Sequence, residues 1–358
     1  MGSRIDGWLI LAVVSVLAAS LANLFAVSRA IGGGLFARQC AFSLVGLCVL
    51  WVLSHVHSTS WQRAASALYG LGLALLVAVL VFGELRGGTR GWFSLGPFSL
   101  QPSEFARTGT LLVMASSVAR RDSKLLDFRS FLGLLVLWSV PVGLILLEPD
   151  LGVALTYAPL LIVALWLGGL PTRIWILIGV LAVAGAVGSW TTLLKPYQKE
   201  RLLTVVQPDR DPYGAGYQVR QSRIAVGSGG LGGQGLGRGP QSVLRFLPAQ
   251  HTDFAFAAWA ESTGFVGASG LLVCFGLLLW RLAVTAVSSE SRFGLVATMM
   301  VCCWLGFQAT VNLGMVLGWL PTTGVTLPLF SYGGSSLVST CATLAIVESI
   351  WRDRVVNR

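Results

Sequence analysis

The chain has 358 residues, of which 54% are hydrophobic and only 11% are charged, and its net charge is +10. A soluble globular domain carries about 25% charged residues, so the composition excludes a water-soluble protein and indicates many helices in a lipid bilayer. The basic residues lie at the ends of apolar runs and in one long loop. This placement favours lipid headgroups, and not nucleic acid, as partners of the positive charge.

The apolar runs predict an all-α polytopic membrane protein with one transmembrane domain that covers residues 1–358. A helix of about 20 apolar residues crosses the hydrocarbon core of a bilayer, and ten segments meet this requirement. No small-residue cleavage pattern follows the first segment, so we expect it to be a retained helix. The segments lie near residues 7–27, 36–55, 62–83, 104–118, 130–148, 152–169, 173–194, 253–282, 293–318 and 333–351.

Lys and Arg are more frequent in one set of short loops than in the other, and this bias predicts the orientation of the helices. Both termini are expected in the cytoplasm, and the long loop 195–252 between the seventh and eighth helices is expected outside. The unusual polar clusters then all fall on the extracytoplasmic side. They are Gln101–Glu104, Glu148–Gly152, Asp253 and the segment 321–336.

Several outer segments are expected to have local structure. Residues 92–95 and 98–100 flank Gly96-Pro97 and predict a small hairpin. Residues 213–226 favour a short surface helix. The run 227–239 is rich in glycine, which lets a backbone approach a ligand closely, so we expect this loop to form part of the substrate site. Gly264 and Gly267 are expected bend points of the eighth helix.

Asp253 lies where the long polar loop ends and the longest apolar run begins. An ionised side chain is costly to bury at the edge of a membrane and therefore calls for an explanation. One interpretation is a general base or a cation ligand. The other is a helix N-cap, although His251 or Thr252 would also serve as the cap. The residues alone leave both interpretations open.

For the other carboxylates near the outer face, the sequence pattern favours a structural role over a role in catalysis or binding. Glu104 and Arg107 share a helix face, either as a structural ion pair, which we favour, or as a charged pair that lines an outer cavity. Glu148 and Asp150 bracket a proline and predict a tight turn with a helix cap at Asp150. Glu261 is expected to accept a buried hydrogen bond that fixes helix packing.

No nucleotide-binding, serine-nucleophile or zinc-protease motif occurs in the chain, and we expect no organic cofactor. A carboxylate at an outer cavity, basic loop residues and access to lipid together predict a lipid-phosphate substrate.

Four motifs in order resemble the SEDS family (shape, elongation, division and sporulation), whose members include RodA and FtsW. The resemblance covers nearly the whole chain, and the residues before Asp253 are more similar to the RodA type. The motifs are Gln101-Pro102-Ser103-Glu104, Glu148-Pro149-Asp150-Leu151-Gly152, the run from Gly227 through Phe254, and Phe330-Ser331-Tyr332-Gly333-Gly334-Ser335-Ser336.

The resemblance implies a peptidoglycan glycosyltransferase of the bacterial cytoplasmic membrane that joins lipid II disaccharides at the outer leaflet during cell-wall elongation. It also implies a class B penicillin-binding protein and other cell-elongation membrane proteins as partners. The essential aspartate of the family falls on Asp253, and its Glu and basic residue fall on Glu104 and Arg107. At the position of Arg107 the family usually has Lys. The family's usual pair of Glu residues is Glu261-Ser262 here, so Ser262 replaces the second Glu.

In this activity Asp253 is expected to act as the general base for the acceptor hydroxyl. The leaving pyrophosphate needs positive charge, and the candidates for it are a divalent cation (Mg²⁺ or Mn²⁺) and the side chains of Arg107, Lys195, Arg220 and Arg223. The residues expected to bind substrate or line the cavity are Glu104, Arg107, Lys195, Arg220, Arg223, His251, Ser331 and Ser335.

Two alternatives come from other functional classes. A lipid II flippase is disfavoured because the charges cluster at one face, whereas a transporter site lies near the midplane. A non-catalytic scaffold for a class B penicillin-binding protein has no need of a carboxylate at a lipid-facing cavity.

Overall fold

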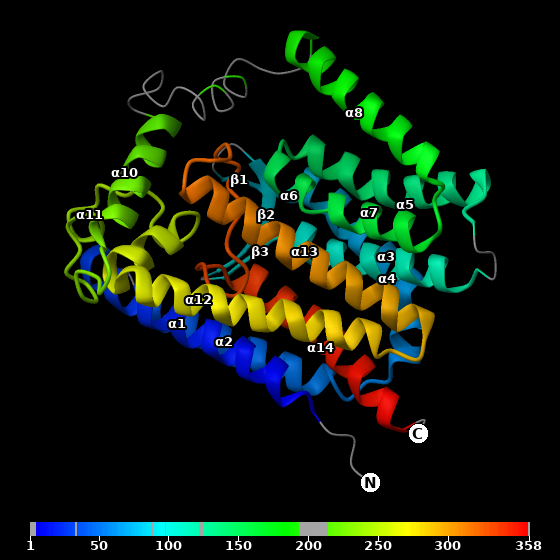
Figure 1. The fold of residues 1–358 in the computed structure, drawn as a ribbon, viewed down its shortest axis with the longest axis horizontal. Helices are drawn as coiled ribbons and strands as arrows, with labels where there is room; N and C mark the ends of the chain where they lie inside the picture. The colour runs from blue at the N-terminus through cyan, green and yellow to red at the C-terminus, as the bar shows by residue number, and fades with distance from the viewer. Residues whose placement is uncertain are drawn as a thin grey trace.

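The protein is a bundle of long helices with a small sheet at one end (Figure 1). The structure is a computed structural model that describes residues 5–32, 34–86, 89–96, 98–121, 125–192, 199, 203 and 214–356. Its helices are α1 (Gly7–Ile31), α2 (Leu35–Leu53), α3 (Ser58–Phe82), α4 (Pro102–Ala119), α5 (Phe128–Leu147), α6 (Leu151–Leu155), α7 (Ala158–Leu167), α8 (Thr172–Thr192), α10 (Ala215–Ser228), α11 (Pro240–Val243), α12 (Ala255–Val287), α13 (Arg292–Val316) and α14 (Gly334–Val356).

Seven helices of the described chain are long and apolar enough to cross a membrane, namely α1, α2, α3, α5, α12, α13 and α14. The protein is therefore a multi-pass membrane protein, as its composition predicted. The other three predicted segments coincide with α4, α8 and the pair α6–α7. The sixth segment is not one continuous helix, because the chain turns at residues 156–157 between α6 and α7. The apolar stretch of this segment covers residues 151–167.

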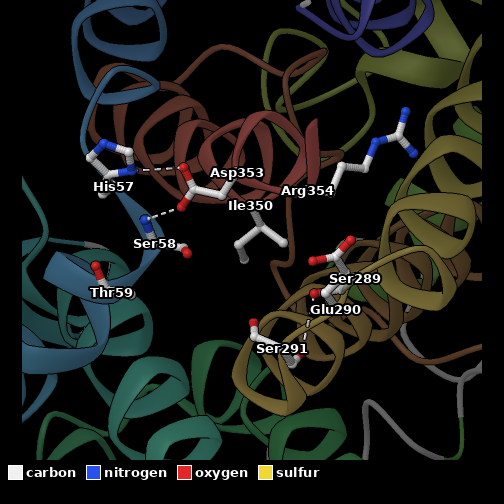
Figure 2. Close-up of a pocket in the computed structure, with 9 residues that line it drawn as sticks. All are labelled: His57, Ser58, Thr59, Ser289, Glu290, Ser291, Ile350, Asp353 and Arg354. Atoms are coloured by element: carbon white, nitrogen blue, oxygen red, sulfur yellow. Dashed lines mark hydrogen bonds and ion pairs between the residues drawn. The ribbon is translucent and has the colours of Figure 1, made fainter. Parts of the chain in front are cut away.

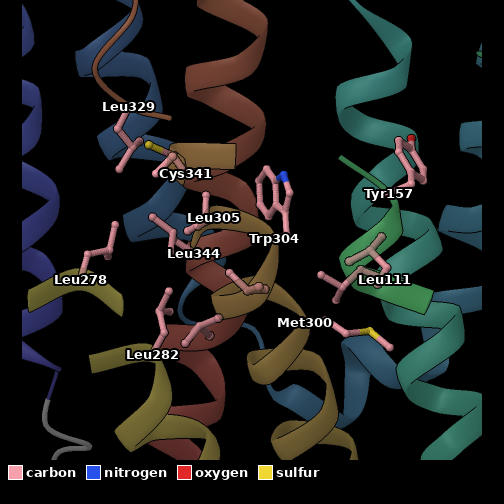
Figure 3. Close-up of a cluster of buried hydrophobic side chains, with 14 of the residues drawn as sticks. Leu111, Tyr157, Leu278, Leu282, Met300, Trp304, Leu305, Leu329, Cys341 and Leu344 are labelled. Carbon is pink, nitrogen blue, oxygen red and sulfur yellow. The ribbon is translucent and has the colours of Figure 1, made fainter. Parts of the chain in front are cut away.

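Helix α13 lies inside the bundle, where it packs against α12 on one side and against α4 and α7 on the other (Figure 1). Trp304 of α13 is almost fully buried, and Figure 3 shows it between residues of α14 and Leu111 of α4. Small residues bring neighbouring helices close together. A methyl group built on Gly72 of α3 would lie 2.9 Å from the Cα atom of Ala106 in α4.

The predicted hairpin is confirmed, within a three-stranded antiparallel sheet that interrupts the otherwise helical fold. The strands are β1 (Glu84–Arg86), β2 (Thr89–Leu95) and β3 (Phe98–Leu100), in the order β1-β2-β3. Leu95 pairs with Phe98 at the turn. The sheet links α3 to α4 and lies at the end of the bundle where α4 begins.

The predicted bend at Gly264 is also confirmed. This glycine has φ 67° and ψ −164° inside α12, a left-handed conformation that glycine adopts without the strain of a side chain. The glycine-rich run fills the bend, because the Phe265 amide donates to the Gly230 carbonyl (2.8 Å) and the Gln234 amide donates to the Glu261 carbonyl (2.9 Å). The helix expected over 213–226 is α10, and it lies with α11 near the beginning of α12 (Figure 1).

Glu261 has the structural role that its sequence position suggested. Its carboxylate accepts hydrogen bonds from the Gln241 amide (2.8 Å), the Ser242 amide (3.1 Å) and the Ser242 hydroxyl (2.6 Å). These groups belong to the first turn of α11, where a carboxylate satisfies amides that have no partner within the helix. Glu261 therefore ties the long loop to α12.

Candidate active site

A cavity of about 230 Å³ opens where α4, α6 and α14 begin and just before α12 begins. It brings together residues from all four polar clusters that the sequence placed on one face, including Asp253. Its lining residues are Trp92, Gln101, Glu104, Asp150, Val153, Thr156, Thr252, Asp253, Gln308, Gly324, Val325, Thr326, Tyr332, Gly333, Ser335 and Ser336.

Asp253 lines this cavity and is not the N-cap of α12. The helix begins at Ala255, and its N-cap is Phe254, whose side chain makes no capping hydrogen bond. The N-cap interpretation of Asp253, and the same role for His251 or Thr252, are therefore wrong. A methyl group built on Gly324 would lie 3.9 Å from Oδ2 of Asp253, so a residue without a side chain leaves space next to the carboxylate.

Asn312 of α13 holds the backbone of Asp253 in place. Its Nδ2 donates to the Asp253 carbonyl (2.9 Å) and to the Val325 carbonyl (2.7 Å). One buried amide thus joins the turn before α12 to the loop that carries Gly324. Asn312 was not among the site residues predicted from the sequence, although an isolated amide inside a long apolar helix is a signal for a buried polar role.

The segment between α13 and α14 supports the same turn from the other side. Ser331 donates from Oγ to the Thr252 carbonyl (2.6 Å), and the Tyr332 amide donates to the His251 carbonyl (2.8 Å). The rings of His251 and Tyr332 meet edge to face with centroids 5.9 Å apart. Burial lowers the pKa of His251, which keeps its ring neutral near pH 7.

Ser331 and Ser335 differ in their relation to the cavity. Ser335 lines it, donates to the Ser99 carbonyl (2.7 Å) and accepts from the Gln101 amide (3.1 Å). Ser331 is outside the lining and acts on the backbone before Asp253.

Glu104 and Arg107 form an ion pair between two nearly fully buried side chains. The Arg107 guanidinium also donates to Oγ1 of Thr156 (3.0 Å) and lies 4.0 Å from the centroid of the Trp304 ring. Glu104 lines the cavity, whereas Arg107 lies behind it. The pair therefore combines both interpretations, because it is structural at Arg107 and exposed to the cavity at Glu104.

The turn after α5 contains the cap that the sequence predicted. Asp150 is the N-cap of α6, and its side chain accepts from the Val153 amide (3.0 Å). Its second oxygen accepts from Nε2 of Gln101 (3.3 Å), and Asp150 lines the cavity. Burial is the largest cause of a raised pKa of Asp150, and the nearby Glu104 raises it further.

The basic residues expected at the leaving group have separate locations. Arg223 of α10 donates to the carbonyls of Leu317 (2.9 Å) and Gly318 (3.0 Å), just beyond the end of α13. Neither Arg223 nor Arg220 is among the lining residues of the cavity. Lys195 lies outside the described residues. Substrate roles for these three side chains stay predictions.

The expected divalent cation finds no ready-made protein site. The described part of the chain has no group of three or more His, Cys, Asp or Glu side chains able to hold a metal ion. Mg²⁺ is often held by one or two carboxylates together with substrate phosphates, so the divalent cation stays a prediction.

A second pocket lies at the other end of the bundle, near the end of α14 (Figure 2). Asp353 there accepts from the Ser58 amide (2.7 Å) and lies 2.9 Å from Nδ1 of His57. These contacts satisfy polar groups at the beginning of α3. The polar groups of this pocket therefore join α14 to α3.

Comparison with known proteins identifies this architecture. The model of the FtsW, RodA and SpoVE proteins, described as a cell cycle protein family, matches residues 5–355. The chain belongs to the SEDS family. It is 39% identical to the peptidoglycan glycosyltransferase MrdB of Escherichia coli (strain K12), over 90% of this chain and 86% of MrdB. It is 35% identical to the probable peptidoglycan glycosyltransferase FtsW of Coxiella burnetii, over 96% of this chain and 95% of that protein.

Solved structures share the fold. One is a chain described under the structural coordination of polymerization and crosslinking by a peptidoglycan synthase complex, with a TM-score of 0.84, 36% identity and 98% coverage of both chains. Another is the rod shape determining protein RodA of Thermus thermophilus, with a TM-score of 0.73, 33% identity and 98% coverage of both chains. Because FtsW and RodA-type proteins both appear among the relatives of this SEDS protein, its assignment to the RodA type stays a prediction.

Proposed function

We propose that this SEDS peptidoglycan glycosyltransferase polymerises lipid II at the outer leaflet of the bacterial cytoplasmic membrane, as the elongation-type member of its family. The observation that carries the proposal is the position of Asp253 in a cavity that also receives Glu104 and Asp150. The activity named for the relatives supports it. In the proposed reaction a sugar hydroxyl attacks a sugar carbon that carries a pyrophosphate.

Asp253 is the proposed general base. The 4-hydroxyl oxygen of the acceptor GlcNAc forms a bond to C1 of the donor MurNAc, the bond from C1 to the pyrophosphate oxygen breaks, and the hydroxyl proton passes to the Asp253 carboxylate. A direct displacement of this kind inverts the α-linked donor to a β-linked product. General base catalysis contributes about 10²- to 10⁴-fold in rate. Asn312 and Ser331 fix the turn and thereby the direction of this carboxylate.

The leaving pyrophosphate is the part of the reaction that calls for positive charge. Arg107 is nearly fully buried and paired with Glu104, so we assign it to organising the cavity wall and not to direct contact with phosphate. The proposed direct contacts to the phosphates are then made by Lys195, Arg220 and Arg223, on the long loop that precedes Asp253.

The cavity is large enough for the sugar ring at the reaction centre but not for the whole lipid-linked substrate. Pockets that enclose a drug-sized ligand measure about 300–1,000 Å³, and this cavity measures about 230 Å³. The sugar ring at the reaction centre is then inside, while the growing glycan and the polyprenyl chain extend into the outer aqueous phase and the lipid.

The proposed topology has ten membrane spans, both termini in the cytoplasm and the loop 195–252 outside. Seven long apolar helices and the coincidence of α4, α6–α7 and α8 with the remaining predicted segments support it. The likeness to a chain from a peptidoglycan synthase complex supports a class B penicillin-binding protein as partner. Other cell-elongation membrane proteins are the further proposed partners.

The test uses the purified protein in liposomes with labelled lipid II, with and without a class B penicillin-binding protein. Wild type is expected to form polymer, and Asp253→Asn is expected to form none. Exchange of lipid II between leaflets without polymer would indicate a flippase. Absence of polymer under both conditions, with the partner still bound, would indicate a scaffold.

A further inference from the structure

Glu148 is a fully buried carboxyl group at the end of α5, with no role in the proposed reaction. Its exposed fraction is 0%, and neither of its oxygens has a hydrogen-bond partner in the part of the chain that the structure describes. Asp150, two residues later, has partners for both of its oxygens. The contrast makes Glu148 the unsatisfied member of this turn.

The charged neighbours of Glu148 include two other carboxylates. Asp150 acts electrostatically on Glu148, Glu104 acts on Asp150, and the Arg107 guanidinium is already paired with Glu104. A buried carboxylate without a counter-charge or a hydrogen bond is very costly, and such a group takes up a proton instead. The ionisable residues on the elements near this end of α5 include Tyr69 on α3, Glu84 and Arg86 on β1, Arg90 on β2, Glu104 and Arg107 on α4, Asp150 before α6 and Tyr157 before α7.

The Glu148 carboxyl group lies directly against the backbone of β2. A methyl group built on Gly91 would lie 2.7 Å from Oε2 of Glu148, so a side chain at residue 91 would push against this carboxyl group. The next residue, Trp92, lines the active-site cavity, as does Asp150 on the other side of the turn. Glu148 therefore lies against the residue next to Trp92, which lines the cavity, and it precedes the cavity residue Asp150 by two positions in the chain.

We propose that Glu148 is a positioning residue of the active site, held as a neutral carboxylic acid beneath Gly91, and that its ionisation displaces β2 and the turn at Asp150 and so opens the cavity wall. The proposal rests on the proposed glycosyltransferase reaction only for its activity assay. Catalysis is expected to require the neutral form, because an ionised Glu148 must move toward water or attract a cation into the protein.

The raised pKa of Glu148 also supports a neutral carboxylic acid in the folded protein. Burial, with a smaller contribution from Asp150, raises the pKa of Glu148 to about 8. The folded protein thus binds a proton that the unfolded chain has released above its pKa of 4.5. Stability from this group is full below pH 4.5 and falls as pH rises toward about 8.

The main test compares the pH dependence of wild type with that of Glu148→Gln, a neutral side chain of the same shape. Polymerisation by wild type is expected to fall about tenfold between pH 7 and pH 9, since the protonated fraction falls about tenfold for a pKa of about 8. Glu148→Gln is expected to keep near-wild-type activity at pH 7 and to lack this alkaline decrease. The same alkaline decrease in both proteins would overturn the proposal.

Two further measurements do not depend on polymerase activity. The infrared difference spectrum of wild type minus Glu148→Gln at pH 7 is expected to contain the carbonyl stretch of a protonated carboxylic acid that disappears by pH 9. The melting temperature of wild type relative to Glu148→Gln is expected to fall over the same pH range. A carboxylate band at pH 7, or parallel melting curves, would overturn the proposal even if the proposed function stands.

Gly91→Ala provides a second variant. The added methyl group meets Oε2 of Glu148 and is expected to lower activity at pH 7 in the wild-type background. Because Gln has the same size as Glu, combining it with Glu148→Gln is not expected to restore activity, whereas Glu148→Ala makes room for the methyl group and is expected to restore it in part. No restoration by Glu148→Ala would show that the contact does not position β2.

Discussion

The ion pair between Glu104 and Arg107 provides a quantitative test of how the active site is built. Both side chains are nearly fully buried, and removing one partner of a buried pair typically costs about 3–5 kcal/mol because the other charge is left uncompensated. Arg107→Ala also removes the hydrogen bond to Thr156 and the stacking on Trp304. It is therefore expected to be the more destabilising of the two single changes to alanine.

The double change to alanine is expected to cost less than the sum of the single changes. A coupling of about 2–3 kcal/mol, at the upper end of the range for residues in contact, is the expectation for two buried partners. The measurement is thermal unfolding of the four proteins in detergent, together with polymerisation of labelled lipid II. Arg107→Lys tests geometry at constant charge, because Lys lacks the planar group that stacks and forms two bonds.

An ion pair at the surface of the same protein is the matched control. Arg121 and Asp127 lie 2.7 Å apart, and the Asp127 side chain is 60% exposed, so solvent screening is expected to make their coupling much smaller than that of the buried pair. Simple additivity of the Glu104 and Arg107 changes, at the level of this control pair, would refute the argument that the two buried residues act as a unit.

Three further predictions concern Asp253, Asn312 and Arg223. Asp253→Asn is expected to lower polymerisation by at least about 10²-fold with an unchanged melting temperature, and near-wild-type polymer from the folded variant would disprove the general base. Asn312→Ala is expected to lower stability by about 1–3 kcal/mol and to lower kcat, whereas Thr310→Ala on the exposed side of the same helix should do neither; equal effects in a melting and activity assay would remove the positioning role. Arg223→Gln is expected to lower the melting temperature through its lost bonds to the backbone just beyond α13; unchanged melting with reduced polymerisation would instead support a substrate contact.

The sequence predicted best those features that depend on neighbours along the chain. The hairpin at Gly96, the cap at Asp150, the helix over 213–226 and the bend at Gly264 all follow from local backbone preferences. The ion pair between Glu104 and Arg107 follows from the spacing of residues on one helix face.

Features that depend on contacts between distant segments were not predicted in the same detail. Asn312 acts on Asp253, which is 59 residues away, and nothing in the local sequence specifies this partner. The N-cap interpretation of Asp253 failed because the helix begins two residues later, within the usual uncertainty of helix ends. The unpaired state of Glu148 depends on the packing of β2 and is equally absent from the local pattern.

The glycine-rich run has a consequence for how the long loop acts on the active site. Its residues form backbone hydrogen bonds on both sides of the bend, since Gln234 and Gly235 donate to residues 261 and 262, and residues 265 and 266 donate to Gly230 and Leu231. The run and the bend must therefore move together. Asp253 lies at the beginning of the helical segment before the bend, and Glu261 ties α11 to that same segment. A partner that displaces the loop would rotate this segment about Gly264 and shift Asp253 relative to Asn312. The glycines thus act on the turn that carries Asp253 through the kink of α12, without any of residues 229–239 lining the cavity.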